Sequence, residues 1–409
     1  MKSTSRKGTE MPLIRHVRTL LLSSPYAHAE HPEILECFPS GPKRTVGMVE
    51  ITLDNGVKGV GEGYLAVFAP EVFRAIVDLC KPYLEGTEAF DRQERVRDLC
   101  RICDYWSLQG AARHVISAFE IALVDAQSKS LGKPAWKMFT DSTDPCIRAY
   151  GSGGICDTKD HFNQEMDMLN GLGINLYKIR SVKSDIFRTA WLLNEAQQKG
   201  IKVGVDMCQN LANPSQAVDD VVRFIEQTQN MSGQEIEFVE EAIGPHDTEG
   251  FKELRKKTSV AVCGGEIITT PWDMISRMRD QVYQFVQPDA SVIGGFSALE
   301  EIFSASEETQ TAAVVHAWGG PVAMMANYHA AFGLGGKLVE YPMLAFPLGD
   351  VLLAESLRIE SGQVLCPRTP GIGIEITPEI EAKFPFDPKA VYSCKLLNRG
   401  APSDESWKD

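Results

Sequence analysis

The sequence predicts an α/β protein: a TIM-type (β/α) barrel with an N-terminal α+β capping domain that the C-terminal segment completes. Eight short apolar strands recur along the chain from residue 147, and the segments between them have helical spacing. Successive strand ends lie about 23 to 34 residues apart, the length that a strand, a loop and a crossover helix consume. This repeat is typical of a barrel. A doubly wound open sheet is the alternative, but it needs a reversal of strand order for which the sequence offers no sign.

The first third of the chain, residues 1–142, predicts the capping domain. Strands are expected at 13–22, 46–53 and 57–62, and Asp54-Asn55-Gly56 has the composition of a hairpin turn between the last two. The apolar period then changes from two to about 3.6. Helices are expected at 70–84, 90–105 and 110–131.

Residues 143–364 are predicted to form the barrel. Its strands are expected at residues 147–152, 176–180, 202–206, 237–240, 260–266, 284–289, 311–317 and 337–341. Residues 365–409 leave the repeat, and their glycine-rich PRTPGIGIEIT stretch is expected to pack back on the capping domain. The tail from Arg399 is expected to be disordered.

Composition and charge exclude several classes of partner. The net charge of −14 argues against nucleic acid or an anionic membrane surface as the main partner. No apolar run approaches the length that spans a bilayer. The ten cysteines are scattered without the spacing of a disulfide framework, which indicates a reducing, cytoplasmic location.

Three acidic residues end consecutive predicted strands: Asp206, Glu240 and Glu266. Catalytic groups of a barrel come from the carboxyl ends of its strands, so these carboxylates are expected to lie within several ångströms of one another. Unpaired carboxylates at such distances repel, and a hard divalent cation relieves the repulsion. Ligands that are all oxygen favour Mg²⁺. The alternative is that each acid pairs with a local lysine or arginine.

Lys178 and Arg180 end the second predicted strand of the barrel. Positions i and i+2 of a strand point to the same face, so both side chains are expected to reach the barrel mouth. Two cations beside a metal predict a site for a substrate carboxylate. The alternative is a solvated strand end.

His316 and Asp289 end the seventh and sixth strands and are expected to form a hydrogen-bonded pair. An Asp that accepts from one imidazole nitrogen leaves the other nitrogen as a general base. Glu340, at the end of the eighth strand, is either a partner of the substrate or of a catalytic group, or a salt-bridge residue. Trp318 is expected to shape the pocket beside His316 and to contact substrate.

This series of motifs resembles the enolase superfamily, in its mandelate racemase-like subgroup, over nearly the whole chain. The matching pieces are GEGY, the Lys178-x-Arg180 pair, GVDMCQN, FVEEA, CGGEI, QPDAS, VVHAWG and GIGIE. The resemblance implies Asp206, Glu240 and Glu266 as Mg²⁺ ligands. It also implies the Asp289–His316 dyad on one face of the substrate, with Lys178 and Arg180 on the other. The metal and the cations would stabilise an enediolate, and capping loops near 22–45 and 64–70 would close the site.

Two departures from the family pattern bear on the reaction. Arg180 stands where many members have a second lysine, and arginine holds its proton too tightly to act as an ordinary base. Chemistry with a single base, His316, is therefore favoured: dehydration of a sugar acid to a 2-keto-3-deoxy acid. The second departure is Glu-Glu-Ala at 240–242, where proline often follows the acids; it is expected to reshape the loop and leave Glu240 in place.

Three alternatives stay open. The first is a cycloisomerase that acts on a sugar lactone or an anhydro-sugar acid, and the second is a racemase or epimerase. The third is a barrel that has lost catalysis and serves for binding. The resemblance also implies a homo-oligomer, because members commonly form dimers or octamers.

Overall fold

A computed structural model of the chain describes residues 11–26, 43–143, 146–155, 158–344, 346–390 and Trp407. Most of the predicted capping loop and most of the tail from Arg399 lie outside these residues. Trp407 contradicts the expected disorder at its own position: its ring packs against Trp191 and Phe162 of the barrel, with ring centroids 5.1 and 6.0 Å away.

The N-terminal part of the chain forms a three-stranded antiparallel sheet covered by helices. Its strands are β1 (Ile14–Pro25), β2 (Lys43–Leu53) and β3 (Lys58–Glu62), in the order β1-β2-β3. The expected hairpin joins β2 to β3, with Gly56 at a positive φ of 86°. The helices are α2 (Leu65–Phe68), α3 (Pro70–Cys80), α4 (Arg92–Ser107) and α5 (Ala111–Ser130), the last three near their predicted positions.

Helix α5 lies directly on β3, and glycine makes this contact possible. A Cβ at Gly61 would lie 2.0 Å from the carbonyl oxygen of Ala118, and one at Gly59 would lie 2.1 Å from that of Ala122. Only residues without a side chain allow the backbones to approach this closely. Most of α5 is buried, including the charged residues Glu120 and Asp125.

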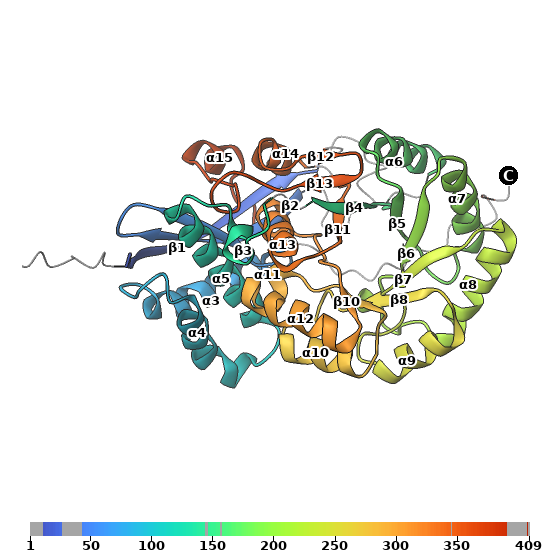
Figure 1. Cartoon of the computed structure of the whole chain (residues 1–409), viewed down its shortest axis with the longest axis horizontal. Helices are drawn as coiled ribbons and strands as arrows, with labels where there is room; N and C mark the ends of the chain where they lie inside the picture. Colours follow the sequence, from blue (N-terminus) through green and yellow to red (C-terminus); the bar gives the residue numbers. More distant parts are fainter. Residues whose placement is uncertain are drawn as a thin grey trace, which may run out of the picture.

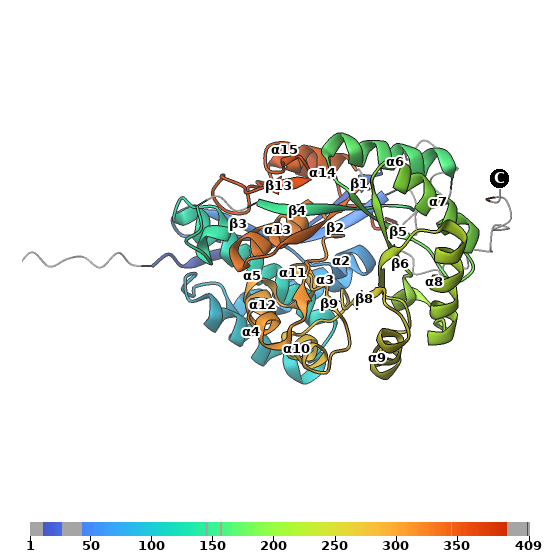
Figure 2. The same ribbon diagram turned by 45° about the vertical axis from the view of Figure 1, so that its right-hand side comes forward.

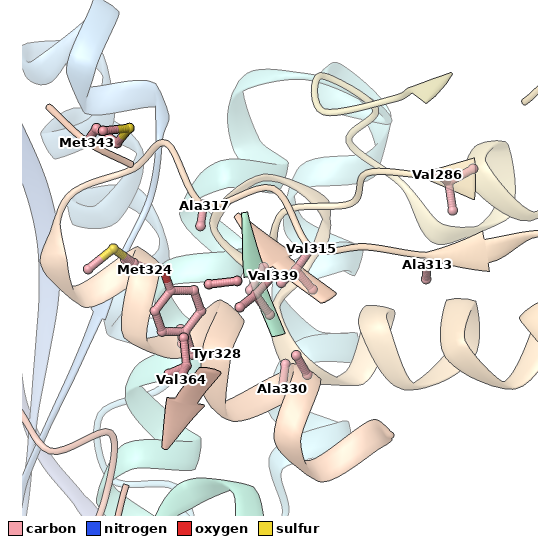
Figure 3. Close-up of a cluster of buried hydrophobic side chains, with 14 of the residues drawn as sticks. Val286, Ala313, Val315, Ala317, Met324, Tyr328, Ala330, Val339, Met343 and Val364 are labelled. Atoms are coloured by element: carbon pink, nitrogen blue, oxygen red, sulfur yellow. The ribbon is translucent and has the colours of Figure 1, made fainter. Parts of the chain in front are cut away.

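Eight parallel strands form the predicted barrel, seen as the green-to-orange ring on the right of Figure 1. They are β4 (Cys146–Ser152), β5 (Leu176–Arg180), β6 (Lys202–Asp206), β7 (Ile236–Glu240), β8 (Ala261–Gly264), β9 (Phe285–Val286), β10 (Ala312–Ala313) and β11 (Leu338–Pro342). Each pairs with the next from β4 to β10, and β11 pairs with β4. A bridge between Val315 and Val339, which lie close together in Figure 3, closes the ring. Strand order therefore excludes the doubly wound sheet.

Strands β8, β9 and β10 are shorter than predicted, and this places their functional side chains in the loops that follow. Glu266 lies two residues after β8, Asp289 three after β9 and His316 three after β10. The barrel is ringed by α6 (Lys159–Leu172), α7 (Ile186–Gln198), α8 (Val218–Ser232), α9 (Thr248–Lys257), α10 (Pro271–Arg279), α12 (Gly295–Thr309) and α13 (Pro321–Leu334), with the short α11 (Ala290–Ile293) before α12. None of the helices in the described part of the chain has the length and apolarity that crossing a bilayer demands.

The chain after β11 returns first to the barrel and then to the capping sheet. After α14 (Pro347–Leu353), β12 (Ile359–Glu360) and β13 (Gln363–Leu365) extend the barrel sheet, with β13 antiparallel to β4. The Ile372 amide then donates to Asp125 of α5 at 2.8 Å, and Arg18 of β1 pairs with Glu381 of α15 (Pro378–Lys383) at 2.8 Å. The exact boundaries at 142 and 364 stay a prediction.

Candidate active site

Lys178 lies at the bottom of the site, between two carboxylates. Its side chain is 1% exposed, and its Nζ lies 2.5 Å from Oε1 of Glu240 and 2.9 Å from Oε1 of Glu340. Burial alone would lower the pKa of Lys178, but these two carboxylates hold it well above the ordinary value. Glu340 therefore combines the two roles expected of it: it is a salt-bridge residue, and its partner is a predicted catalytic group.

The Arg180 guanidinium is held in place by hydrogen bonds, a cation–π contact and a nearby carboxylate. Its Nη1 donates to the Gly153 carbonyl at 2.7 Å and to Ser152 Oγ at 3.0 Å. The guanidinium lies 4.0 Å from the ring centroid of Trp318, a cation–π contact, and its Nε is 3.7 Å from Asp206 Oδ2. Trp318 thus touches Arg180, the second member of the predicted cationic pair.

The three predicted metal ligands follow one another around the barrel. Arg180, Asp206 and Glu240 are register neighbours on β5, β6 and β7, and Glu266 lies in the turn after β8. Within the described residues, however, no three His, Cys, Asp or Glu side chains are arranged closely enough to hold a metal ion. Glu240 is turned toward Lys178, and Oε1 of Glu266 accepts from Asn210 at 2.7 Å.

The chemistry of this donor set nevertheless fits Mg²⁺. All three groups are carboxylates, as a hard cation requires. Burial raises the pKa of Glu240 to about 8; Lys178 opposes the shift, and the carboxylates of Asp206, Glu340 and Glu266 add to it. Such a concentration of buried negative charge is what a divalent cation would relieve.

His316 and Asp289 form the expected pair. His316 Nδ1 lies 2.8 Å from Asp289 Oδ2, and both side chains are buried. The other oxygen, Oδ1, accepts from the amide and hydroxyl of Ser291, at 2.8 and 2.7 Å, because Asp289 is the N-cap of α11. The dyad is therefore oriented by a helix end, and His316 Nε2 points toward the acids, 3.4 Å from Glu266 Oε2.

The charge of His316 depends on the carboxylates around it. Burial alone would lower the pKa of the imidazole, but three carboxylates raise it to about 10. They belong to Glu266, Glu340 and Asp289. The imidazolium is thus favoured for as long as these carboxylates have no other cation near them.

Sequence reasoning missed a set of amides that orient the charged groups. Gln287 Nε2 donates to Glu240 Oε2 at 2.5 Å, Asn327 Nδ2 donates to Asp289 Oδ1 at 2.9 Å, and Asn210 holds Glu266. Gln287 lies in the QPD motif and Asn210 in GVDMCQN, so the motifs contained a signal for both. Asn327 lies within the uniformly apolar helix α13, where nothing marks it.

Glu241, the second acid of the Glu-Glu-Ala motif, contacts the turn that follows β8. Glu241 adopts a positive φ of 42°, and its Oε1 accepts from the Gly265 amide at 2.6 Å. It therefore supports the turn that carries Glu266, while Glu240 keeps its place at the strand end, next to Asp206 in register.

Three residues of the capping domain contact residues 316–323, the loop that carries His316 and the start of α13. Glu62, in the GEGY motif, accepts from the amides of Gly320 and Ala323 at 2.6 and 3.0 Å, at the start of α13. The Tyr64 ring meets the His316 ring edge-on, with centroids 6.1 Å apart. Arg44 of β2 donates to the Trp318 carbonyl. The capping domain thus contacts and positions the loop that carries His316.

A cavity of about 310 Å³ opens beside Trp318 and Arg44. Its other walls are mainly apolar and come from α13, α14 and the loop after β11, with Met324, Met343 and Phe346 among them. Met343 and Met324 are labelled at the left of Figure 3, Met343 above Met324.

Two family models together match most of the chain. The one described as "Enolase C-terminal domain-like" matches residues 163–380, and the one described as "Mandelate racemase / muconate lactonizing enzyme, N-terminal domain" matches residues 28–139. The second range covers β2, β3 and helices α2 to α5, and the first covers barrel strands β5 to β11.

Individual proteins resemble the chain over most of their length. Arabinonate dehydratase of Saccharolobus solfataricus is 24% identical over 334 residues, 80% of this chain and 87% of that protein. D-galactarolactone cycloisomerase of Agrobacterium fabrum is 24% identical over 358 residues, 84% of this chain and 92% of that protein. The crystal structure of L-talarate dehydratase from a Polaromonas species, complexed with Mg and L-glucarate, superposes with a TM-score of 0.76 at 20% identity, covering 92% of this chain and 98% of that one.

Proposed function

The chain belongs to the enolase superfamily, in its mandelate racemase/muconate lactonizing enzyme branch, and on this premise we propose that it dehydrates a sugar acid to a 2-keto-3-deoxy acid. The observation that carries the proposal is the single oriented base. His316 is fixed by Asp289 and points toward the acids, whereas the cations of β5 are engaged in other contacts. The named sugar-acid dehydratases among its relatives support the same reaction.

Asp206, Glu240 and Glu266 are the residues that would hold Mg²⁺. Bound there, the ion would supply positive charge to the substrate carboxylate. Lys178 and Arg180 would add their own charge from the neighbouring strand. If the Glu266 carboxylate turned toward a cation, it would stabilise the His316 imidazolium less, and the pKa of His316 would fall.

The proton moves by way of His316. Its Nε2 takes the hydrogen from the α-carbon, and the electrons of that bond pass into the carboxylate to give an enediolate. The β-hydroxyl then leaves as water with a proton, which His316 can return. The resulting enol rearranges to the 2-keto-3-deoxy acid, so atoms and charge balance without any oxidant.

A cycloisomerase is the second candidate, because one relative is a D-galactarolactone cycloisomerase. The first half of that reaction is the same, but the leaving group is a ring oxygen. A racemase or epimerase needs a second base on the opposite face. Lys178, which the sequence left as the one candidate, lies within 2.9 Å of two carboxylates, which makes it a poor proton acceptor.

A panel of sugar acids and lactones tests the proposal. The purified chain with Mg²⁺ is incubated with each compound in D₂O, and the product is identified by NMR. Dehydration gives a 2-keto-3-deoxy acid. Cycloisomerisation gives a ring-opened or rearranged isomer of the substrate that differs in mass by solvent deuterium alone. Epimerisation gives deuterium at an inverted α-carbon. If no compound exchanges its α-proton, the barrel serves for binding and the proposed reaction is wrong.

The partners proposed for the chain are a sugar-acid carboxylate and further copies of itself. A cytoplasmic location stays a prediction from the scattered cysteines. Substrate selection is assigned to the capping domain, from which Tyr64 and Arg44 reach His316 and Trp318.

A further inference from the structure

One peptide group in the loop after β4 lies between a carboxylate and Arg180. Its carbonyl, on Gly153, accepts from Arg180 Nη1 at 2.7 Å, and its N–H, on Gly154, donates to Glu165 Oε2 at 2.8 Å. We refer to this group as the 153–154 peptide. The carbonyl and the N–H of a planar trans peptide point in opposite directions, so Glu165 and Arg180 lie on opposite sides of it. A carboxylate that accepts from the N–H polarises the group and makes its carbonyl a stronger acceptor for the guanidinium.

Glu165 reaches the loop from α6, which lies beside β5 in Figures 1 and 2. Two further groups surround its carboxylate. The Tyr177 hydroxyl of β5 donates to Oε2, and His161 Nε2, one turn earlier on α6, lies 3.3 Å from Oε1. Burial and the Glu165 carboxylate raise the pKa of the Tyr177 phenol, which keeps it a neutral donor. The Glu165 carboxylate, only 12% exposed, is therefore fixed by three separate groups.

The loop admits this arrangement because both of its residues are glycine. Gly154 adopts a positive φ of 69°, a conformation that favours glycine. A Cβ at Gly153 would lie 2.5 Å from Glu165 Oε1 and would push the carboxylate away from the Gly154 amide. Both glycines therefore serve the contact between the loop and Glu165.

Strand β5 separates Glu165 from the site. Alternate residues of a strand point to opposite faces, so Lys178 and Arg180 point into the barrel, whereas Tyr177 points outward and meets Glu165. The Gly153 amide donates to the Lys178 carbonyl at 3.0 Å, which anchors the loop to the edge of this strand. The 153–154 peptide thus joins a carboxylate outside the barrel sheet to a cation at the barrel mouth.

We propose that Glu165 is a positioning residue of the reaction: through the 153–154 peptide it fixes the Arg180 guanidinium where the substrate carboxylate binds. This role rests on the proposed function, in which Arg180 supplies charge to that carboxylate. The bond from Arg180 to the peptide carbonyl, at 2.7 Å, is shorter than its contacts to Ser152 Oγ at 3.0 Å and Asp206 Oδ2 at 3.7 Å. Without Glu165 the peptide could turn, and the guanidinium would lose its best-placed acceptor.

Phenylglyoxal, a reagent for guanidinium groups, tests the contact without any turnover. Modification of Arg180 in the full chain is followed by mass spectrometry. In Glu165→Ala, Arg180 should react about 2- to 10-fold faster, the range that loss of one net hydrogen bond allows. Gly153→Ala keeps the acid but displaces it, and it should accelerate the reaction in the same way. Asp167→Ala is the matched control, because Asp167 is a 65% exposed acid of the same helix, and it should leave the rate unchanged.

Turnover tests the role of Glu165 in the reaction. In Glu165→Ala, kcat/KM for the sugar acid that the wild type converts should fall roughly 10- to 100-fold, since a small misplacement of a positioned group has that effect. Arg180→Met should cost at least as much. In the Arg180→Met background, Glu165→Ala should cost nothing further, because the two residues act as one unit. A carboxylate that only fastened α6 to β5 would give the same loss in both backgrounds.

Two results would overturn the proposal. One is an Arg180 that reacts at the same rate in Glu165→Ala and Asp167→Ala, and the other is a set of losses that add in the double variant. Should Glu165→Ala fail to fold, as circular dichroism would show, Gly153→Ala takes its place in both measurements. If no sugar acid is converted, the proposed reaction is wrong, and the phenylglyoxal rates still decide whether Glu165 holds Arg180.

Discussion

The His316 imidazole has one nitrogen committed to Asp289 and the other turned toward the acids. His316→Asn keeps a donor that can reach Asp289 but removes the base. Loss of a general base costs about 10²- to 10⁴-fold, so turnover should fall by that range. Deuterium exchange at the α-carbon should disappear with it, and Mg²⁺ binding should persist. Exchange at the wild-type rate in this variant would assign the base to another residue.

Asp206 is the proposed metal ligand whose replacement by an amide we expect to disturb the structure least. Its Oδ1 accepts from the Cys208 amide at 2.9 Å, a bond that asparagine can retain. Asp206→Asn removes one of three anionic ligands, and Mg²⁺ affinity measured by calorimetry should fall by roughly 100-fold, since hard cations depend on ligand charge. Asp219→Asn on the exposed face of α8 changes the chain's charge equally and should leave the affinity unchanged. Equal binding by both variants would remove Asp206 from the metal site.

At the scale of elements, the junction of β3 and α13 joins the two domains. Glu62 of β3 satisfies two amides at the start of α13, and both residues that donate them are buried. Glu62→Ala leaves these amides without an acceptor, and each unsatisfied buried group costs about 1–3 kcal/mol. The free energy of unfolding in urea should therefore fall by about 2–6 kcal/mol for the two amides. Turnover should fall as well, because the same amides belong to the loop after His316.

Two substitutions separate this effect from a general loss of charge. Glu62→Gln keeps an acceptor and should recover part of the stability. Glu71→Ala, in the first turn of α3 and 61% exposed, should change the unfolding free energy by less than about 0.5 kcal/mol. If Glu71→Ala costs as much as Glu62→Ala, the junction has no special role.

The elements also show where sequence patterns stop being informative. The eight strands were predictable because apolar runs recur at the length of a βα unit. The shortness of β9 and β10 was not predictable. Gln287-Pro288-Asp289 and His316 look extended in sequence, but β9 ends at Val286 and β10 at Ala313, followed by an isolated bridge at Val315. Their side chains still reach the site, because the loops leave the barrel at the same edge.

On the scale of the whole molecule, the charged residues proposed for the site follow local patterns, whereas two of the residues that support them, Asn327 and Glu62, depend on distant contacts. Asp206, Glu240 and His316 follow apolar runs, a local signal. Asn327 reaches Asp289 across 38 residues of chain, and Glu62 reaches Gly320 across 258. Contacts of this kind depend on tertiary structure alone. Each of these two contacts joins a carboxylate to an amide group, and no local spacing in the sequence marks the pair.

The stability of the whole chain should depend on pH through a histidine far from the proposed metal site. His329 of α13 is fully buried, and its Nδ1 accepts from the Trp136 amide at 3.1 Å. Burial lowers the pKa of His329 from 6.5 to about 3, although the Ile372 carbonyl opposes the shift. Below pH 6.5, His329 therefore binds a proton in the unfolded chain but stays neutral in the folded chain until the pH approaches 3. The stabilising contribution is complete above pH 6.5 and is lost progressively as pH falls toward 3.

Urea unfolding at pH 6.5 and pH 5.0 measures this contribution. A separation of 1.5 pH units is worth about 2 kcal/mol for one such group. His329→Gln can still accept from Trp136 but cannot bind the proton. The variant should be less stable than the wild type at pH 6.5, and it should lose about 2 kcal/mol less on acidification. Parallel losses in the two proteins would mean that His329 already carries a proton in the folded chain, or that another group dominates the acid response of the fold.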